Sequence, residues 1–376
     1  MAPSASEADR SFLEQALALA ALGEGTTSPN PRVGCVLVRE GRVVGRGFHR
    51  AAGAPHAEAL AVAEAGERSR GATLYVNLEP CCHSGRTPPC ADLLVRSGVE
   101  RVVASCCDPN PLVDGGGFER LRAAGVRVDV GLLAEEARRL NAGFCERHAG
   151  GRPLVTLKAA VTQDGMIAAL EGRSRWITAP AARRAAHRLR YRHDAVLVGA
   201  ATVRRDAPRL TVRLPGIRAE RLRAILSPRL ELDPGKPPFG EESCERLPRV
   251  YVGEGVSEAA VAPFAGRADI VRVPMRRLGH LDLNAVLDDL ARLDVLSVLV
   301  EGGSRTFAGF LESGSVDRVA LFVAPRLLGA RGGTPLLDLR SVAEPRGGWR
   351  VIAEDRVALG EDVLVMGRIS REAERG

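Results

Sequence analysis

The sequence predicts two consecutive α/β domains. Its 376 residues, of which 45% are hydrophobic, are enough to fill two separate cores. Short apolar segments of strand type alternate along the chain with amphipathic segments of helix type, and this alternation is typical of layered α/β domains. The segment AGGRP (149–153), with its glycines and proline, is the expected boundary. We therefore expect a first domain over residues 1–149 and a second over residues 152–370.

The first domain is expected to open on a helix, because Ser6 and Asp9 have the spacing of a capping box and apolar residues then recur on one helical face until Gly23. Segments 33–38 and 43–49 flank a short REGR turn and predict a β-hairpin. The remaining expected elements are strands over 72–78, 101–106 and 126–131, and helices over 56–67, 91–98, 118–125 and 134–148.

The same alternation restarts in the second domain. Expected strands lie within segments 154–165, 194–203, 222–227, 249–253, 269–273, 296–303 and 317–325, and expected helices lie near 179–191, 283–293 and 304–313. The segment 232–245, which is rich in proline and glycine, is predicted to be a loop.

Charge and composition argue against a nucleic-acid-binding protein. The net charge is +7, but the basic residues are scattered and form no dense block, and aromatic residues, at 4%, are too few for a base-stacking surface. A solvated basic surface, or one that attracts small phosphorylated ligands, is the better interpretation.

The cysteines and the N-terminus indicate a cytoplasmic protein with no membrane partner. Seven of the eight cysteines fall within the first 145 residues, which is unlike the even spread of a secreted disulfide scaffold. The N-terminal residues include acids where a signal peptide needs basic and apolar residues, and no run of eighteen apolar residues occurs.

The segment LEPCCHSGRTPPC (78–90) is the strongest chemical signal. Together with HAE (56–58) it offers an imidazole and thiolates, and a zinc ion held by one imidazole and two thiolates keeps a fourth position for water, as in a catalytic site. A glutamate two residues from the histidine can move a proton. The pattern H-x-E followed by P-C matches the signature of zinc-dependent nucleobase deaminases. Cys81 follows Pro80, where we expect a helix to begin whose dipole would favour the thiolate.

Several longer motifs resemble one family, the bifunctional riboflavin-biosynthesis deaminase–reductases called RibD. In the first half these are TTSPNPRVGCVLV (26–38), GFHRAAGAPHAEALA (47–61) and LEPCCHSGRTPPC (78–90). In the second half they are LKAAVTQDG (157–165), SRWIT (174–178), ATVRRDAPRLTVR (201–213) and VEGGSRTFAG (300–309). The resemblance implies a cytidine-deaminase-like three-layer α/β/α domain followed by a dihydrofolate-reductase-like α/β domain.

For the first domain, the resemblance implies one Zn²⁺ held by His56, Cys81 and Cys90, with Glu58 as the proton shuttle and Asn30 and His49 as substrate-binding residues. Two alternatives stay open: Cys82 or His83 could be a ligand in place of Cys81, and the cluster could be a closed structural site. Cys82 departs from the family, which usually shows serine at that position.

For the second domain, the resemblance implies an NADPH site and a substrate site. VEGGSRTF offers Gly302 and Gly303 at a helix N-terminus, where free backbone amides can hold a pyrophosphate. The expected cofactor-binding residues are Ala160, Trp176, Thr202, Asp206, Gly303, Ser304, Arg305 and Thr306. The expected substrate-binding residues are Ser174, Arg190, Leu210, Arg213 and Glu301.

Lys158 is a further catalytic candidate, because it lies on an apolar strand and, with Lys236, is one of only two lysines among 53 lysine and arginine residues. We expect it to point into the reductase cleft and assist as the sugar ring opens. A strand-end lysine whose ammonium reaches water is the alternative.

The resemblance implies deamination of a phosphorylated pyrimidine, 2,5-diamino-6-(5-phosphoribosylamino)pyrimidin-4-one, and reduction of its ribosyl group to ribityl by NADPH. It implies no nucleic-acid partner, and self-association through the reductase domain is a further expectation. The rival interpretations are a nucleic-acid (tRNA) editing deaminase with an unrelated C-terminal domain, and a zinc-stabilised binding module without turnover.

Overall fold

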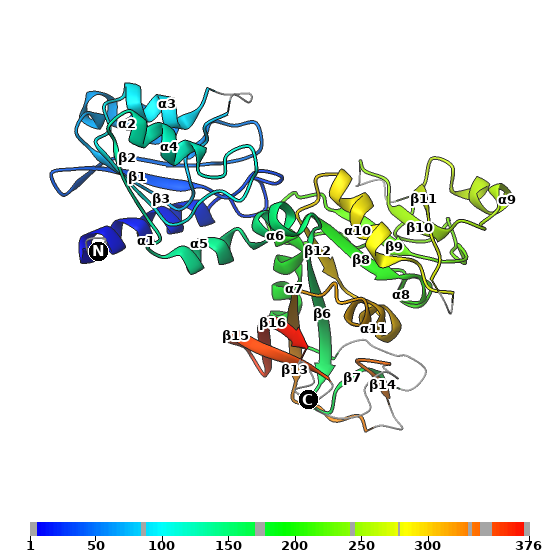
Figure 1. The fold of residues 1–376 in the computed structure, drawn as a ribbon. Helices are drawn as coiled ribbons and strands as arrows, with labels where there is room; N and C mark the ends of the chain where they lie inside the picture. Colours follow the sequence, from blue (N-terminus) through cyan, green and yellow to red (C-terminus); the bar gives the residue numbers. More distant parts are fainter. Residues whose placement is uncertain are drawn as a thin grey trace, which may run out of the picture. The chain divides into compact units, whose positions relative to one another are not determined.

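The computed structural model describes residues 6–83, 88–169, 177–240, 245–276, 279–329, 333–338 and 348–371. It divides into two compact units, Met1–Arg152 and Pro153–Gly376 (Figure 1). Every helix within the described residues is too short or too polar to traverse a bilayer.

The first unit follows the expected order of elements. Its strands are β1 (Gly34–Arg39), β2 (Arg42–Phe48), β3 (Thr73–Val76), β4 (Arg101–Ala104) and β5 (Arg127–Val130). Its helices are α1 (Glu7–Ala21), α2 (Ala57–Ala65), α3 (Cys90–Arg96), α4 (Gly116–Ala123), α5 (Ala134–Leu140) and α6 (Ala142–Gly150). The predicted capping box of α1 is present: the backbone N–H of Asp9 donates to the Ser6 hydroxyl and that of Ser6 to the Asp9 carboxylate.

These strands form one sheet in the order β2-β1-β3-β4-β5, in which β3, β4 and β5 are parallel. Alternate residues of β1 enter opposite cores: Cys35 and Leu37 pack with α2, α3 and α4, whereas Val36 and Val38 pack with α1. Figure 1 shows α2, α3 and α4 on one face of the sheet and α1 and α5 on the other. The predicted three-layer α/β/α domain is confirmed.

The second unit contains the expected strands and four that the sequence patterns did not predict. Its strands are β6 (Leu154–Thr162), β7 (Met166–Ala169), β8 (Ala195–Gly199), β9 (Leu222–Leu226), β10 (Arg249–Gly253), β11 (Asp269–Val273), β12 (Ser297–Val300), β13 (Arg318–Ala324), β14 (Gly333–Pro335), β15 (Trp349–Leu359) and β16 (Asp362–Arg371). Its helices are α7 (Pro180–Arg192), α8 (Ala200–Asp206), α9 (Glu258–Val261), α10 (Leu283–Arg292) and α11 (Ser304–Glu312). The unpredicted strands are β7, β14, β15 and β16.

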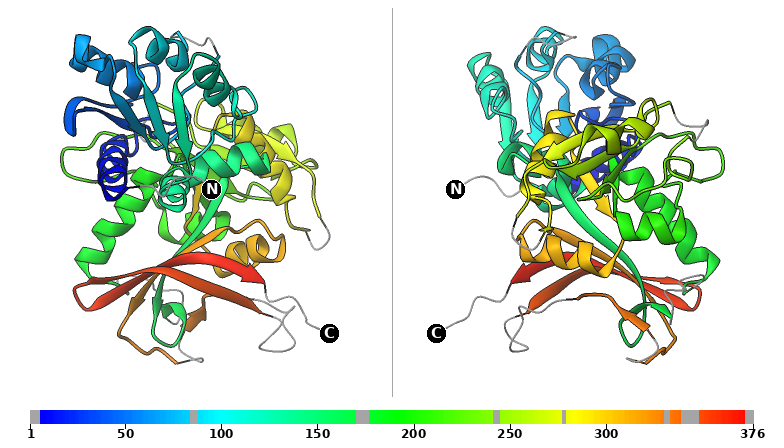
Figure 2. Two further views of the ribbon diagram at one scale, coloured as in Figure 1. Left: turned by 60° about the vertical axis from the view of Figure 1, so that its left-hand side comes forward. Right: turned by 90° about the vertical axis from the view of Figure 1, so that its right-hand side faces the viewer.

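The large sheet of this unit has the order β11-β10-β9-β8-β12-β6-β13-β16-β15. It is parallel from β11 to β13, whereas β16 pairs antiparallel with both β13 and β15. Helices α10 and α11 pack on one face, while α7 and α8 pack on the other. Figure 2 shows the long β15–β16 hairpin beside β13. Because β8 and β12 are parallel neighbours, the segments that follow them begin side by side at the same edge of the sheet.

Two local expectations were wrong. No helix begins at Cys81; the helix of this region is α3, which begins at Cys90. The expected helix over 134–148 is broken at Asn141, whose side chain bonds both backbone groups of Arg32. His193, the residue that caps the end of α7, is buried, and its ring bonds the Thr156 hydroxyl at 3.0 Å.

Candidate active sites

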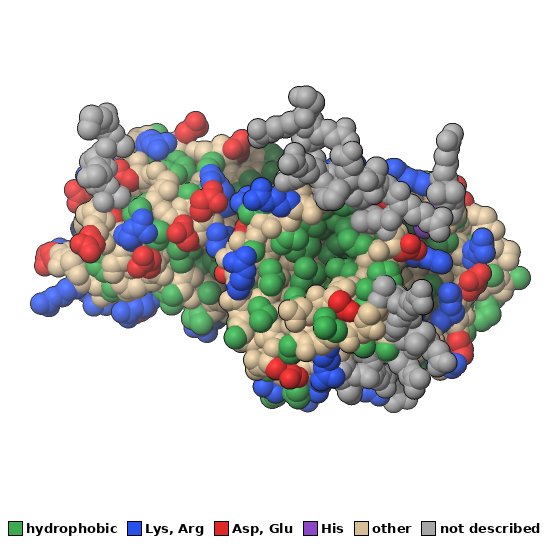
Figure 3. All heavy atoms as spheres, turned by 90° about the horizontal axis from the view of Figure 1, so that it is seen from below, with side chains coloured by type: hydrophobic (Ala, Val, Ile, Leu, Met, Phe, Trp, Pro, Cys, Tyr) green, Lys and Arg blue, Asp and Glu red, His purple; other side chains and the backbone are tan. Residues whose placement is uncertain are grey.

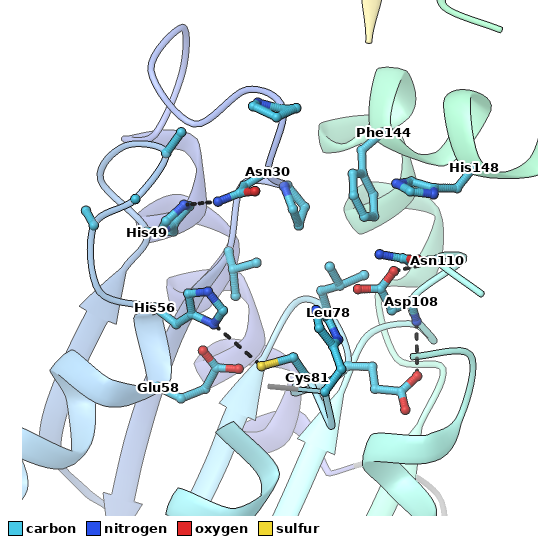
Figure 4. Close-up of a pocket in the computed structure, with 18 residues that line it drawn as sticks. Asn30, His49, His56, Glu58, Leu78, Cys81, Asp108, Asn110, Phe144 and His148 are labelled. Carbon is cyan, nitrogen blue, oxygen red and sulfur yellow. Dashed lines mark hydrogen bonds between the residues drawn. The ribbon is translucent and has the colours of Figure 1, made fainter. Parts of the chain in front are cut away.

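A cavity of about 500 Å³ opens in the first unit at the carboxyl ends of β3 and β4. In Figure 4, His56, Glu58 and Cys81 meet at its floor. Asn30 and His49 line one side, and Asp108, Asn110, Phe144 and His148 line the opposite side. The cavity is large enough for one small-molecule ligand.

His56, Cys81 and Cys90 bring three potential metal ligands together. The His56 Nδ1 lies 3.3 Å from the Cys90 Sγ and 3.6 Å from the Cys81 Sγ, and all three atoms lie within 4.8 Å of one another. A tetrahedral zinc ion with ordinary bond lengths separates sulfur and nitrogen ligands by about 3.5 Å. The three residues therefore fit a zinc ion without rearrangement.

Local structure explains how these ligands converge. His56 is the N-cap residue of α2, and Cys90 is the first residue of α3. Cys81 lies in the loop after β3, and its sulfur accepts the backbone N–H of Cys90 at 3.3 Å. The pKa of Cys81 is lowered, because its sulfur accepts hydrogen bonds from the Cys90 thiol and from His56. A thiolate is the form that binds a metal.

Cys82 and His83 do not join this cluster in the described residues. The Cys82 Sγ lies 3.6 Å from the Leu112 carbonyl oxygen, in the loop before α4. His83 lines the cavity but contributes no atom to the three-residue cluster.

Glu58 is buried in the first turn of α2, with a relative exposure of 3%. Burial raises the pKa of its carboxyl group, and the negative charge of Cys81 raises it further. A carboxyl group whose pKa is raised by burial holds a proton more readily than an exposed one, as a proton shuttle requires.

Asn30 and His49, the two expected substrate-binding residues of this domain, lie side by side in the wall of the cavity. The Asn30 Nδ2 lies 3.1 Å from the His49 Nε2, and the His49 Nδ1 lies 3.2 Å from the Pro55 carbonyl oxygen. Since the Pro55 carbonyl can only accept, Nδ1 carries the proton and Nε2 accepts the amide hydrogen of Asn30. Burial lowers the pKa of His49, which keeps the ring neutral.

The residues of the opposite wall, Asp108, Asn110, Phe144 and His148, were not predicted as site residues. Asp108 is 6% exposed, and burial raises the pKa of its carboxyl group to about 7. The rings of Phe144 and His148 pack at a centroid distance of 4.5 Å. A signal was available for Asp108 and Asn110: they follow β4, which is parallel to β3, so they emerge at the same sheet edge as Cys81.

In the second unit, the segments after β8 and β12 form a cradle of small residues. A Cβ atom on Gly199 would lie 2.5 Å from the Thr306 hydroxyl, and one on Gly302 would lie 2.9 Å from the Thr202 hydroxyl. Gly303 has φ +88°, a conformation that favours glycine. The buried Ser304 hydroxyl has no hydrogen-bond partner among the described residues. Free amides and an unpaired hydroxyl at the start of α11 fit a pyrophosphate group.

The other expected cofactor-binding residues are distributed around this cradle. Thr202 and Asp206 lie on α8, Ser304, Arg305 and Thr306 on the first turn of α11, and Ala160 on β6. Trp176, and the substrate-binding candidate Ser174, lie outside the described residues.

Next to the cradle, Glu301 forms an ion pair with Arg190. The Arg190 Nη1 also donates to the Thr211 carbonyl at 2.9 Å. Lys158 on β6 lies close enough to Glu301 for its charge to help hold the pKa of that carboxyl at about 2, after the larger effect of Arg190. Burial lowers the pKa of Lys158 itself, and Glu301 partly opposes this effect. Arg190, Glu301 and Lys158 are thus brought together.

The two remaining substrate-binding candidates in the described residues, Leu210 and Arg213, differ in exposure. The Leu210 side chain is packed in the core that contains α8, so only its backbone is available to a ligand. Arg213 is exposed, and its backbone N–H donates to the His187 Nδ1 at 3.3 Å. Burial and the charges of Arg190 and Arg213 lower the pKa of His187 to about 4. His187, a neutral ring beside these cations, was not predicted as a site residue.

Both domains of the chain are similar to known proteins. Residues 6–106 match the family model of the cytidine and deoxycytidylate deaminase zinc-binding region, and residues 153–365 match that of the RibD C-terminal domain. The riboflavin biosynthesis protein RibD of Aquifex aeolicus is 42% identical over 361 residues, which cover 96% of this chain and 98% of that protein. The structure of Acinetobacter baumannii RibD (form 1) is 34% identical with a TM-score of 0.87, and covers 97% of this chain and 99% of that one.

A cytidine-deaminase-like domain joined to a reductase domain defines a bifunctional deaminase–reductase. The chain belongs to the RibD family, whose members are bifunctional enzymes of riboflavin biosynthesis. The expected zinc-binding deaminase domain and nicotinamide-dependent reductase domain are both consistent with this family. Its substrate is a small pyrimidine compound.

The nucleic-acid-editing interpretation is not favoured. Residues 153–365 match the RibD C-terminal domain, so this half of the chain is not an unrelated C-terminal domain. On the face in Figure 3, the described Lys and Arg side chains are interspersed with Asp and Glu. Such a mixed face lacks the continuous positive stripe that tracks a nucleic-acid backbone.

Proposed function

We propose that the first domain removes the C2 amino group of 2,5-diamino-6-(5-phosphoribosylamino)pyrimidin-4-one, and that the second reduces the ribosyl group of the product with NADPH. The observation that carries the first half is the convergence of His56, Cys81 and Cys90 beside the buried Glu58, at the floor of a cavity. The observation that carries the second half is the glycine cradle beside Glu301, Arg190 and Lys158.

In the deaminase site, His56, Cys81 and Cys90 would hold the zinc ion. When bound, zinc would supply Lewis-acid chemistry that makes a hydroxide nucleophile available at neutral pH. Glu58 would take a proton at its carboxylate and deliver it to the nitrogen that leaves C2 as ammonia.

Asn30 and His49 would orient the pyrimidine. Because one amide hydrogen of Asn30 is used on His49, its second amide hydrogen and its carbonyl oxygen remain available to the polar edge of the ring. His49 fixes the Asn30 amide and is itself fixed by Pro55.

In the reductase site, Gly303, Ser304 and Thr306 would hold the pyrophosphate of NADPH, with Thr202 packed against the same turn. When bound, NADPH supplies the hydride that C1′ receives as the C1′–O4′ bond opens. The ring oxygen O4′ needs a proton at this step, and the Lys158 ammonium is our proposed donor.

Chelation of zinc tests the proposal. The treated protein should lose ammonia release from the diaminopyrimidine phosphate and still oxidise NADPH with the deaminated compound, because the two sites lie in separate units. Restoration of ammonia release by added Zn²⁺ is expected. Unchanged ammonia release after complete zinc removal would overturn the deaminase assignment.

We also propose self-association through the reductase domain. Val351, Ile352, Val357 and Val363 expose large apolar side chains on the β15–β16 hairpin. Light scattering should give a mass above that of one chain for the wild type, and a lower mass for Val357→Glu. A monomeric wild type would contradict this.

A further inference from the structure

Glu79 is a buried carboxylate that no step of the proposed chemistry uses. Its relative exposure is 4%, and it precedes the zinc-ligand candidate Cys81 by two residues, in the loop after β3. Its backbone N–H donates to the Cys106 carbonyl at 3.1 Å, which ties it to the end of β4.

The side chain of Glu79 accepts five hydrogen bonds, all from the segment 107–118. Oε1 accepts the backbone N–H groups of Gly117 at 2.8 Å and Phe118 at 3.1 Å. Oε2 accepts the Cys107 thiol at 2.9 Å, the Asp108 N–H at 3.1 Å and the Gly115 N–H at 3.0 Å. Hydrogen bonds to an ionised acceptor are stronger than neutral ones, and α4 begins at Gly116, so the anion also faces the positive end of a helix.

Two further contacts hold the residues next to Glu79 against neighbouring helices. A Cβ atom on Gly117 would lie 2.0 Å from the Pro80 carbonyl oxygen, so the backbone of α4 touches the residue between Glu79 and Cys81. On the other side, the Cys81 carbonyl accepts the Ala91 N–H of α3 at 3.1 Å. The loop that carries Cys81 is therefore held between α3 and α4.

We propose that Glu79 is a positioning residue for the deaminase reaction: it locks the loop after β3 onto the start of α4 and thereby fixes Cys81 opposite His56 and Cys90. This inference rests on the proposed function, in which Cys81 is a zinc ligand. It gives Glu79 a role in metal retention and in the geometry of the site, without contact with the reacting atoms.

The carboxylate cannot be replaced by its amide. A carboxylate offers only acceptors, and both oxygens of Glu79 face N–H or S–H donors. In Glu79→Gln the amide nitrogen would face at least two donors and lose their hydrogen bonds, whichever way the amide turned. The ligand loop should loosen while the volume of the side chain stays nearly constant.

The test compares full-length Glu79→Gln with Glu119→Gln, which changes an exposed glutamate on the same helix α4. Zinc transfer to a chelator is followed with time, together with kcat and KM for ammonia release, and thermal unfolding followed by circular dichroism reports whether both units are folded. Glu79→Gln should lose zinc at least ~10-fold faster than wild type and have a reduced deaminase kcat, with KM within about twofold. Zinc loss and kcat equal to those of Glu119→Gln would overturn the positioning role.

Cys107 supplies a second pair of variants that keeps the inference testable if Glu79→Gln does not fold. Cys107 is exposed, and its thiol donates to Glu79. Cys107→Ala removes this donor and should speed zinc loss about threefold, whereas Cys107→Ser retains a donor and should stay near wild type. Equal rates for these two variants would count against the network.

Zinc binding by the wild-type protein distinguishes failure of the proposed function from failure of the positioning role of Glu79. If the wild-type protein binds no zinc, the proposed function and the positioning role both fall. If it requires zinc for ammonia release and Glu79→Gln behaves like Glu119→Gln, only the positioning role falls.

Discussion

Arg190 and Glu301 meet in a two-point ion pair, in which the guanidinium Nε lies 2.6 Å from Oε1 and the Nη2 lies 2.7 Å from Oε2. The pair joins α7 to the end of β12, and the side chains are only 13% and 6% exposed. The ion pair uses both oxygens of the carboxylate. Arg190 and Glu301, both expected to bind substrate, therefore hold each other in position.

Arg190→Leu should destabilise the second unit by on the order of 3 kcal/mol at neutral pH, because it leaves a buried carboxylate without its bonded cation. Chemical unfolding, monitored by the fluorescence of Trp176 and Trp349 in the second unit, measures the effect. Arg184→Leu, an exposed change on the same helix, is the matched control and should be near neutral.

The same pair predicts a pH dependence. The pKa of Glu301 is lowered from 4.5 to about 2, so the pair stabilises the folded state above pH 4.5, and this contribution is lost as the pH falls toward about 2. The difference in unfolding free energy between wild type and Arg190→Leu should therefore shrink between about pH 5 and about pH 3. A constant difference over this range would contradict the assignment.

Lys158→Met keeps the length of the side chain and removes its charge. We expect the reductase rate to fall at least ~10²-fold while ammonia release and NADPH affinity stay near normal. Lys158→Arg should rescue little, because arginine is bulkier and does not release its proton. Lys236→Met changes the other lysine, which is exposed, and should be silent. Unchanged reduction kinetics in Lys158→Met would contradict the catalytic role of Lys158 and favour a structural one.

Glu58→Gln should retain zinc and lower deamination at least ~10²-fold, because an amide of nearly the same shape cannot accept the proton. Reduction of the deaminated compound should continue. Glu67→Gln, an exposed change just after α2, controls for the loss of a negative charge. Near-normal ammonia release by Glu58→Gln would rule out its role.

Cys81→Ala and Cys90→Ala should each lose zinc, whereas Cys82→Ser should keep both zinc and activity. The geometry favours this outcome because the Cys82 sulfur is turned toward Leu112, away from His56. Metal content of the three purified proteins decides the matter. If only the Cys82 variant lost zinc, the ligand assignment would have to be reversed.

Much of the fold could be predicted from the sequence, because buried strands such as β8 and β12 are continuous apolar segments. The β15–β16 hairpin was missed for the same reason: most residues of β15 are exposed, and Glu354, Asp355 and Arg356 interrupt its apolar pattern. Asn141 ended a helix early through a bond to Arg32, a partner more than a hundred positions away that no local pattern can reveal.

Some residues of the candidate deaminase site could be predicted from the sequence, and others could not. His56, Glu58, Cys81 and Cys90 carry a spacing that reflects their chemistry, and a sequence motif was enough to propose them. The opposite wall of the cavity comes from the loop after β4 and from α6, and its residues have no fixed spacing to the motif. The five donors to Glu79 include four backbone amides, which any sequence could supply.

The most direct test follows ammonia release and NADPH oxidation in one reaction with 2,5-diamino-6-(5-phosphoribosylamino)pyrimidin-4-one. The account predicts that the purified zinc protein releases ammonia and oxidises NADPH in equal molar amounts. It also predicts that without NADPH the deaminated pyrimidine accumulates with its ribosyl group intact. Failure of the zinc-loaded, folded protein to release ammonia from this compound, or ammonia release with no NADPH oxidation at any stage, would contradict the account.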